Sequence, residues 1–323
     1  MRRNGLSRLL LAAALLWPGA AFAAEPHWPA SLTLGTASPG GTYYAYGEGL
    51  ARILTRTLGL PVTMRSTEGP SENIQLLEAG EIELAFVTQG VALQAWNGTS
   101  GWTGGKQLRA MRAMFPMYDT PFQFVVRQDA GIGSIAELAG KRVGVGPRGG
   151  TTATYMPEFL KALKLEATLV HGDWADLAAQ AADRTLDGLA VAAGVPFPSF
   201  AEIERKTKVR YLAPTRSQVL DLRLAMPELG ASIVAAGSYP SLRTHYATVG
   251  LYNFAVAHRD LPDDLVYAIV DATFANQELL IEAHPAAAET TPANLSRNSF
   301  LPFHGGAARW YHNKSASGVI RGD

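Results

Sequence analysis

The sequence predicts an α/β protein of two lobes, each a mostly parallel sheet flanked by helices, with a hinge joining them. Three observations favour this fold class. Short apolar runs alternate with amphipathic segments along the chain, which is typical of strand–helix–strand units. Two glycine-rich loops, about 110 residues apart, each lead from a predicted strand into a helix. The length of 323 residues is also close to the upper limit for one core.

The first series of elements occupies residues 32–88. Its first helix carries an apolar stripe from Tyr46 to Leu58, at the spacing of three and four residues that places side chains on one helix face. A second helix begins at Pro70 and stops at Gly80. We expect strands at 32–37, 62–67 and 82–88.

The second series repeats this pattern. We expect strands at 122–127, 141–145, 168–171 and 188–193, and helices at 135–138, around 159–163, and at 173–186 and 200–207. A further strand at 249–257 precedes the longest expected helix, 265–283, which would return the chain to the first lobe. The predicted domains are lobe 1, residues 24–126 plus 250–323, and lobe 2, residues 127–249.

Residues 1–23 have the three parts of a cleavable signal peptide. A basic region around Arg2, Arg3 and Arg8 precedes a short apolar run, which a Pro-Gly break and an Ala-Phe-Ala site follow. The apolar run is shorter than the roughly 20 residues that span a bilayer. We therefore expect cleavage after Ala23 and a protein exported to the periplasm.

The composition excludes several classes of function. The chain has 28 Lys+Arg and 28 Asp+Glu, so it lacks the basic excess of a nucleic-acid-binding protein. It has no cysteine, which excludes disulfides, thiolate metal sites and a lipidated N-terminal cysteine. We expect a monomer without nucleic-acid partners.

No motif indicates catalysis, a metal or a cofactor. The histidines are scattered, and no G-x-S-x-G elbow occurs. Gly144 to Gly149 fits G-x-G-x-x-G, with Asp173 further on, as in a dinucleotide fingerprint. The loop is too long for the third glycine to pack helix on strand, and an exported protein meets little NAD. We predict no catalytic residue, no metal and no cofactor.

Three segments, 38–42, 67–73 and 149–152, deliver polar loops to helix N-termini. Helix N-termini present unpaired N–H groups and partial positive charge, which suit a carboxylate or another small anion. The carboxyl ends of parallel strands gather such loops at one edge. Ordinary helix capping explains any one of them. Three loops from two lobes favour a ligand cleft.

The chain resembles the TAXI-type solute-binding proteins that serve TRAP transporters, over essentially the whole mature length. Four groups of residues and a C-terminal stretch carry the resemblance. They are Gly35-Thr36 with Gly40-Gly41-Thr42-Tyr43-Tyr44; Thr67 with Ser71-Glu72-Asn73; residues 77–86 with Gln89; Ala193-Gly194-Val195-Pro196; and residues 302–307 with Trp310-Tyr311. The family's G-S-G-T element appears here as Gly149-Gly150-Thr151-Thr152, after Arg148.

The resemblance implies a type II periplasmic binding-protein fold that closes over a ligand. It also implies delivery to a TRAP membrane permease driven by an ion gradient, and ligands such as glutamate, glutamine or 2-oxoglutarate. The expected binding residues are Thr36, Gly41, Thr42, Tyr43, Tyr44, Thr67, Ser71, Asn73 and Gln89 from lobe 1, and Arg148, Gly149, Gly150, Thr151, Thr152 and Gly194 from lobe 2.

Two alternatives stay open on the same scaffold. One is a sensor module that presents the ligand to a receptor, which differs only in its partner. The other is a small-acid hydrolase, which would need an acid–base pair with shifted pKa values in the cleft. His171 and Asp173, at the end of one predicted strand, are the residues to examine for this role.

Overall fold

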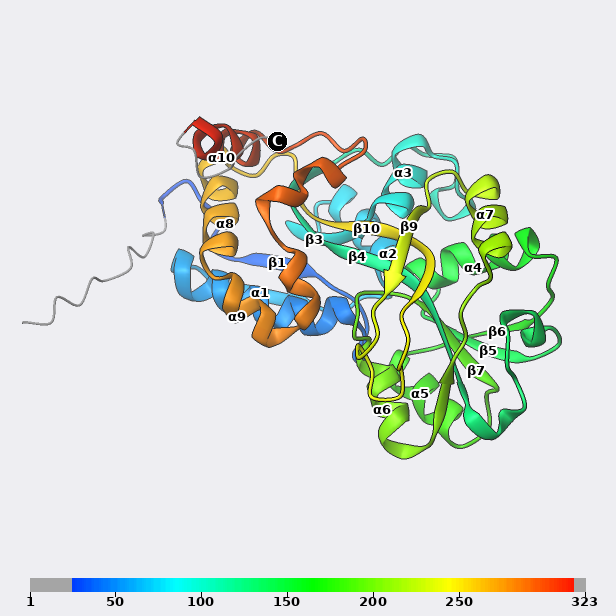
Figure 1. The fold of residues 1–323 in the computed structure, drawn as a ribbon. Helices are drawn as coiled ribbons and strands as arrows, with labels where there is room; N and C mark the ends of the chain where they lie inside the picture. Colours follow the sequence, from blue (N-terminus) through cyan, green and yellow to red (C-terminus); the bar gives the residue numbers. More distant parts are fainter. Residues whose placement is uncertain (1–24, 317–323) are drawn as a thin grey trace, which may run out of the picture.

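The computed structural model describes residues 25–316 and contains a single mixed sheet flanked by helices (Figure 1). The strands follow the order β2-β1-β3-β10-β4-β7-β5-β6, while β8 pairs with β4 and β9 pairs with β10. The strands are β1 Leu32–Gly35, β2 Val62–Arg65, β3 Leu84–Thr88, β4 Met111–Arg127, β5 Arg142–Gly146, β6 Thr168–His171, β7 Gly188–Ala192, β8 Val209–Tyr211, β9 Gly230–Val234 and β10 Tyr246–His258.

Two long strands connect the two ends of this sheet. β4 pairs with β10 from Met111 to Pro121 and with β7 from Phe122 to Val126. β10 in turn pairs with β9 at residues 246–250 and with β3 at residues 253–257. We call the part built on β1, β2 and β3 lobe 1, and the part built on β5, β6 and β7 lobe 2. The domain boundaries at 126/127 and 249/250 remain a prediction.

The two lobes confirm the expected fold class, with one addition. β1, β2 and β3 run parallel to one another, as do β5, β6 and β7. β10 is antiparallel to both β3 and β4, and β4 is antiparallel to β7. The sheet is therefore parallel within each lobe and antiparallel where the lobes join.

Helices cover both faces of each lobe (Figure 1). In lobe 1, α1, α8, α9 and α10 form one apolar layer with the sheet, and α2 and α3 form the other. In lobe 2, α4 and α7 cover one face, and α5 and α6 the other. The helices are α1 Thr42–Leu58, α2 Pro70–Glu78, α3 Gln89–Asn97, α4 Thr151–Ala162, α5 Trp174–Ala182, α6 Pro198–Lys206, α7 Arg216–Ala225, α8 Asp263–Ala275, α9 Gln277–Ala283 and α10 Gly305–Ala316.

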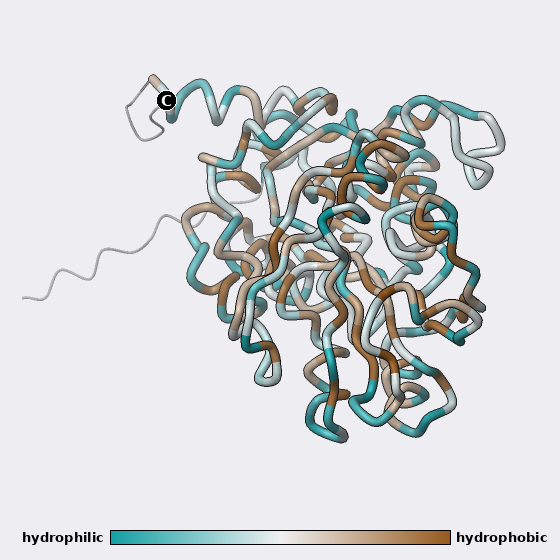
Figure 2. Tube along the Cα trace, turned by 45° about the vertical axis from the view of Figure 1, so that its right-hand side comes forward, coloured by the Kyte–Doolittle hydropathy of each residue, from teal (hydrophilic) through white to brown (hydrophobic). Residues whose placement is uncertain are grey.

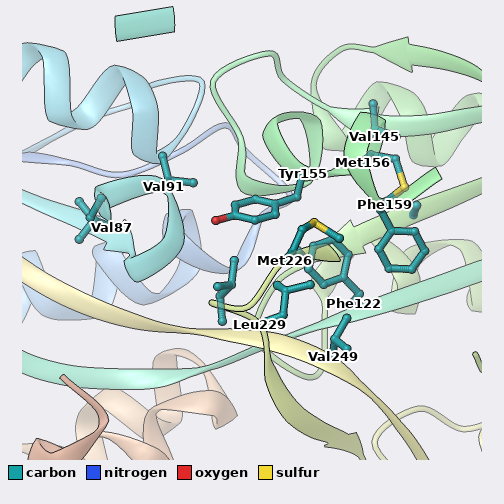
Figure 3. Packing of buried hydrophobic residues seen from close by; sticks show 14 of the residues in the cluster. Val87, Val91, Phe122, Val145, Tyr155, Met156, Phe159, Met226, Leu229 and Val249 are labelled. Carbon is teal, nitrogen blue, oxygen red and sulfur yellow. The ribbon is translucent and has the colours of Figure 1, made fainter. Parts of the chain in front are cut away.

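One apolar cluster runs through both lobes. It joins Val87 and Val91 of lobe 1 to Phe122, Tyr155 and Phe159, and Figure 3 shows Tyr155 between Val91 and the side chains of lobe 2. Hydrophobic stretches of the chain gather inside the molecule, and hydrophilic ones form the outer loops (Figure 2). The lobes therefore share buried surface in addition to the two long strands.

The longest expected helix was wrong. Residues 265–283 form two helices, α8 and α9, because Asn276 leaves helical geometry (φ −121°, ψ 30°) and its amide donates to the carbonyl of Ala272. The longest described helix is α1, with 17 residues. The return of the chain to lobe 1 is confirmed, since α8 packs on α1 and α10.

The sheet has longer and more numerous strands than the sequence analysis predicted. The strand expected at 122–127 is the end of β4, which begins at Met111. Pro116 and Pro121 lie inside β4, although proline is unusual in a central strand, and a register shift against β10 accommodates the first of them. β8, α7 and β9 were not expected; α7 buries only Leu222, so its sequence shows no apolar stripe.

Candidate functional site

The lobes enclose a cavity at the carboxyl ends of β1, β3 and β7. The space open to the centre of a water molecule is about 50 Å³, and one water needs roughly 10–15 Å³ by this measure, so a small organic molecule fits. The lining residues are Ala37, Gly41, Thr42, Tyr43, Glu68, Gly69, Pro70, Thr88, Tyr118, Thr120, Gly150, Thr151, Thr152, Trp174, Val191, Ala192, Ala193, Gly194, Phe197 and Asn253.

Several helices begin at this cavity without a side-chain cap, among them α1 from lobe 1 and α4 from lobe 2. Gly41 is the N-cap of α1 in lobe 1, and Gly150 is the N-cap of α4 in lobe 2; neither end has a capping side-chain hydrogen bond. The first N–H groups of an α-helix have no acceptor within the helix. Both ends therefore turn free donors and partial positive charge toward the same space.

Buried polar side chains form a network beside these helix ends. The Tyr43 hydroxyl donates to Asn253 Oδ1 at 2.6 Å, and the Thr88 hydroxyl donates to the same atom at 3.1 Å. Thr88 Oγ1 also lies 2.6 Å from Thr151 Oγ1. Because Thr88 gives its proton to Asn253, Thr151 is the donor in that contact. The Thr88–Thr151 bond joins lobe 1 to lobe 2.

The remaining hydroxyls keep a proton for a ligand. Thr120 Oγ1 accepts from Asn253 Nδ2, and Thr152 Oγ1 accepts from the N–H of Ala192. Burial raises the pKa of the Tyr43 phenol far above its usual range, so it keeps the proton that it donates to Asn253. The polar part of the cavity is therefore rich in donors.

The cavity has little charge. Among the lining residues that the structure describes there is no Lys, Arg or His, and the one carboxylate is Glu68, whose Oε2 accepts the N–H of Gly149 at 3.0 Å. Trp174, Phe197 and Val191 supply apolar surface. An anion in this space would be held by neutral donors and helix ends.

Direct bonds hold the two lobes together around the cavity. Ser71, at the start of α2, donates its N–H and its hydroxyl to the carbonyl of Gly149. Thr42 Oγ1 donates to the carbonyl of Gly194 at 3.2 Å, and Ser199 Oγ donates to the carbonyl of Gly40 at 2.9 Å. The lobes are therefore in a closed arrangement.

Two further contacts cross between the lobes. The His284 ring, buried in lobe 1, donates through Nε2 to the carbonyl of Pro196, and its Nδ1 accepts from Ala286. Burial lowers the pKa of this imidazole to about 4, so it is neutral near pH 7. At Gly90, an added Cβ would overlap the Tyr155 hydroxyl of α4, so a larger residue there would push against lobe 2.

Seven predicted binding residues line the cavity. They are Gly41, Thr42, Tyr43, Gly150, Thr151, Thr152 and Gly194. Of the two adjacent tyrosines, Tyr43 lines the cavity, and Tyr44 does not. Gly194 packs so tightly that an added Cβ would lie 2.7 Å from the Tyr118 ring.

Other predicted residues support the site from behind. Thr67 donates to Asn73 Oδ1 at 2.8 Å, and the Asn73 amide donates to the carbonyls of Thr36 and Phe86. These bonds fix the start of α2 against β1 and β3. Ser71 and Gly149 contact each other across the lobes and do not line the cavity.

Two predicted residues lie elsewhere. Gln89 bonds to Ser299 and to the carbonyl of Arg297, on the other side of the β3–α3 junction. Arg148 is exposed and outside the lining, so the closed cavity does not use it to pair a carboxylate. His171 and Asp173 are also outside the lining, which leaves the hydrolase alternative without an acid–base pair in the cavity.

Sequence reasoning missed several residues of the site. Asn253 and Thr120 lie inside long strands, and Trp174 begins α5. Asn253 could have been found, because it is a polar residue within an otherwise apolar strand. Among the described residues, no group of three or more His, Asp or Glu side chains is placed to hold a metal ion.

The NMT1-like family matches residues 34–314. The chain belongs to the NMT1-like family. Solved structures with the same fold include malate-bound MatC (Rpa3494) from Rhodopseudomonas palustris, with TM-score 0.58 and 14% identity over 88% of this chain and 99% of that one. Rpa4515 of R. palustris with adipate has a TM-score of 0.54 and 18% identity, over 90% of this chain and 98% of that one. The periplasmic binding protein BugD has a TM-score of 0.55 and 14% identity, over 92% of this chain and 100% of that one. The fold is thus that of periplasmic binding proteins.

Proposed function

We propose that this member of the NMT1-like family is a periplasmic solute-binding protein, without enzymatic activity, that holds a small carboxylate between its lobes. The observation that carries the proposal is the convergence of two uncapped helix ends, α1 from lobe 1 and α4 from lobe 2, on one donor-rich cavity between the lobes. Such helix ends bind carboxylates through N–H groups and partial charge. None of the described helices is long and apolar enough to cross a membrane.

Binding and closure are linked in this proposal. A ligand at the N-terminus of α1 gains the N–H groups of α4 and the hydroxyl of Thr152 only when the lobes meet. It therefore binds the closed arrangement more tightly and increases its population. Closure also forms the direct bonds from Ser71 and Thr42 to lobe 2 and from Ser199 of lobe 2 to Gly40 of lobe 1.

The partner and the ligand follow from the TAXI resemblance. We propose delivery to a TRAP-type permease and a ligand related to glutamate, glutamine or 2-oxoglutarate. Malate and adipate in two proteins of the same fold are consistent with an acid ligand. The proposed binding residues are the seven predicted ones that line the cavity, with Thr88, Thr120 and Asn253.

A melting screen tests the proposal. Purified protein would be heated with C2 to C6 mono- and dicarboxylates, amino acids and, as a contrast, nucleotides. An acid at about 100 times its Kd stabilises the folded state by about 2.7 kcal/mol, which raises Tm measurably. If nucleotides raise Tm and no acid does, the proposed function is wrong. Thr152→Val, which removes one free donor, is the matched variant and should weaken binding of the best acid.

A further inference from the structure

Trp174 is a lobe 2 residue whose indole reaches the N-terminus of a lobe 1 helix. Its side chain is 7% exposed and packs edge-on against Phe197, with ring centroids 4.9 Å apart. A Cβ placed on Gly41, the N-cap of α1, would lie 3.4 Å from Trp174 Cδ1 and 3.9 Å from Nε1. The benzo edge of the ring instead contacts Gly146. The N–H edge of the indole therefore faces the start of α1, where both residues line the cavity.

This N–H has no acceptor among the residues that the structure describes, and the Trp174 side chain lines the cavity. The N–H of Trp310, the other buried tryptophan among the described residues, differs: it donates to the carboxylate of Asp271, as the half-buried Trp28 does to Asp264. Buried indole N–H groups usually have a partner, because leaving one unpaired costs free energy. The unpaired donor and the free N–H groups of α1 point to one acceptor that both would share.

The lining also lacks what an ammonium group needs. Asn253 Oδ1 already accepts from Tyr43 and Thr88, and the hydroxyls of Thr120 and Thr152 already accept one bond each. Glu68, at the rim, is committed through Oε2 to Gly149. Among the lining side chains and helix ends, free donors therefore outnumber the free acceptors, which are the unpaired Tyr118 hydroxyl and Glu68 Oε1, and an ammonium group supplies only donors.

We propose that the Trp174 indole N–H binds the acid group of the ligand together with the N-terminus of α1, and that the ligand is a small acid without an ammonium group, such as a 2-oxo acid. This inference rests on the proposed function. It adds a binding residue from α5 and distinguishes between acids of the same carbon skeleton. It also explains how an anion is held without a cationic side chain, since an indole N–H to a carboxylate is a charge-assisted bond.

The first experiment compares two tryptophan variants. Trp174→Phe keeps an aromatic ring and removes the N–H; Trp310→Phe changes a tryptophan outside the cavity. With 2-oxoglutarate and pyruvate as probes in calorimetry, we expect Trp174→Phe to weaken binding by roughly tenfold to a hundredfold and Trp310→Phe to leave it unchanged. Equal affinity of Trp174→Phe and the unchanged protein would overturn the role of Trp174.

The second experiment compares matched ligands on the unchanged protein. We expect 2-oxoglutarate to bind at least tenfold more tightly than glutamate, and pyruvate more tightly than alanine. Tighter binding of the amino acids would overturn the ligand class and point to Glu68 as an ammonium acceptor, which Glu68→Gln would then confirm by losing that preference. If no acid of either kind binds, the proposed function fails first, and the two failures are thereby distinguishable.

A spectroscopic measurement covers the case in which Trp174→Phe folds poorly. With nitrogen-15 in the indole rings, the Trp174 N–H signal should move downfield when the preferred acid is added, because a charged acceptor deshields the proton. Signals of Trp28 and Trp310 should stay in place. An unmoved Trp174 signal at saturating acid would contradict the proposal.

Discussion

The two sides of the cavity are built differently. On lobe 1 and the connecting strands, two buried side chains are fixed by neighbours on the same side: Tyr43 by Asn253, and Asn73 by Thr67 and Thr36. On lobe 2, the glycine loop before α4 depends on the other lobe, since Ser71 and Glu68 supply bonds to Gly149. The contrast indicates that the lobe 1 side of the site is preformed and that closure completes the lobe 2 side. Four measurements test this difference between the two sides.

The largest expected effect is on the preformed side. Asn253→Ala removes an amide that bonds to Tyr43, Thr88, Thr120 and the carbonyl of Tyr118, and leaves several of these groups buried without partners. We expect the free energy of unfolding to fall by about 4 kcal/mol in urea titrations. Exposed Asn313→Ala is the control and should change it by less than about 0.5 kcal/mol. A loss below 1 kcal/mol would mean that this side is not held by the network.

The next effect is on a bond between the lobes. The pKa of His284 is about 4 in the folded protein and roughly 6.5 in an unfolded chain. As pH falls below 6.5, His284 binds a proton in the unfolded chain but stays neutral in the folded protein until the pH approaches 4. The free energy of unfolding therefore has its full value, as far as His284 is concerned, above pH 6.5. It decreases as the pH falls toward 4, by about 3 kcal/mol at most.

His284→Gln tests this pH dependence, because glutamine keeps a donor for the carbonyl of Pro196 and does not titrate. We expect a flatter profile of unfolding free energy between pH 7 and 4.5 than in the unchanged protein. Exposed His312→Gln serves as the control and should keep the steep profile. Parallel profiles for both variants would assign the pH dependence to other groups.

Gly90→Ala should act on closure. The added methyl group overlaps the Tyr155 hydroxyl of α4, and overpacking of this kind costs about 1–3 kcal/mol. We expect the Kd for the best acid to rise roughly tenfold. Tyr155→Phe on the same background should recover part of the loss, while Tyr155→Phe alone measures the hydroxyl's own contribution. Unchanged binding by Gly90→Ala would show that binding does not require the closed contact.

The smallest expected effect is that of Arg148→Ala. Arg148 is exposed and does not line the cavity, so its removal should change the Kd for the best acid less than twofold. Calorimetry at low and high salt separates a long-range effect, which salt screens, from a direct ion pair. A tenfold loss that persists in high salt would return Arg148 to the site.

The sequence predicted the parts of the site whose signals are local. Gly41 and Gly150 each close a glycine-rich loop between a strand and a helix, and this pattern alone indicates helix ends at the edge of a parallel sheet. The same pattern predicts the first residues of the two helices as site residues, namely Thr42, Tyr43, Thr151 and Thr152. The exchange of bonds between Ser71 and Gly149 required the packing of two lobes, which no local pattern specifies.

The residues that were missed depend on tertiary pairing. Thr120 and Asn253 meet only because β4 and β10 pair as long antiparallel strands, and only the end of β4, at 122–127, was expected from the sequence. In the sequence, Trp174 has the pattern of a core residue, and most of its side chain does pack in an apolar cluster of lobe 2. Arg148 was predicted to bind the ligand, but in the structure this residue of the loop is exposed to solvent.

The continuous strands β4 and β10 have a consequence for how the protein can be divided. Each strand gives one end to lobe 1 and the other to lobe 2. A fragment cut between the lobes would carry a severed strand whose ladder of N–H and C=O groups has lost its partners, an aggregation-prone edge. Neither half is therefore a module that can be transplanted alone, and gene fusions or split reporters should be placed in surface loops that leave both strands whole.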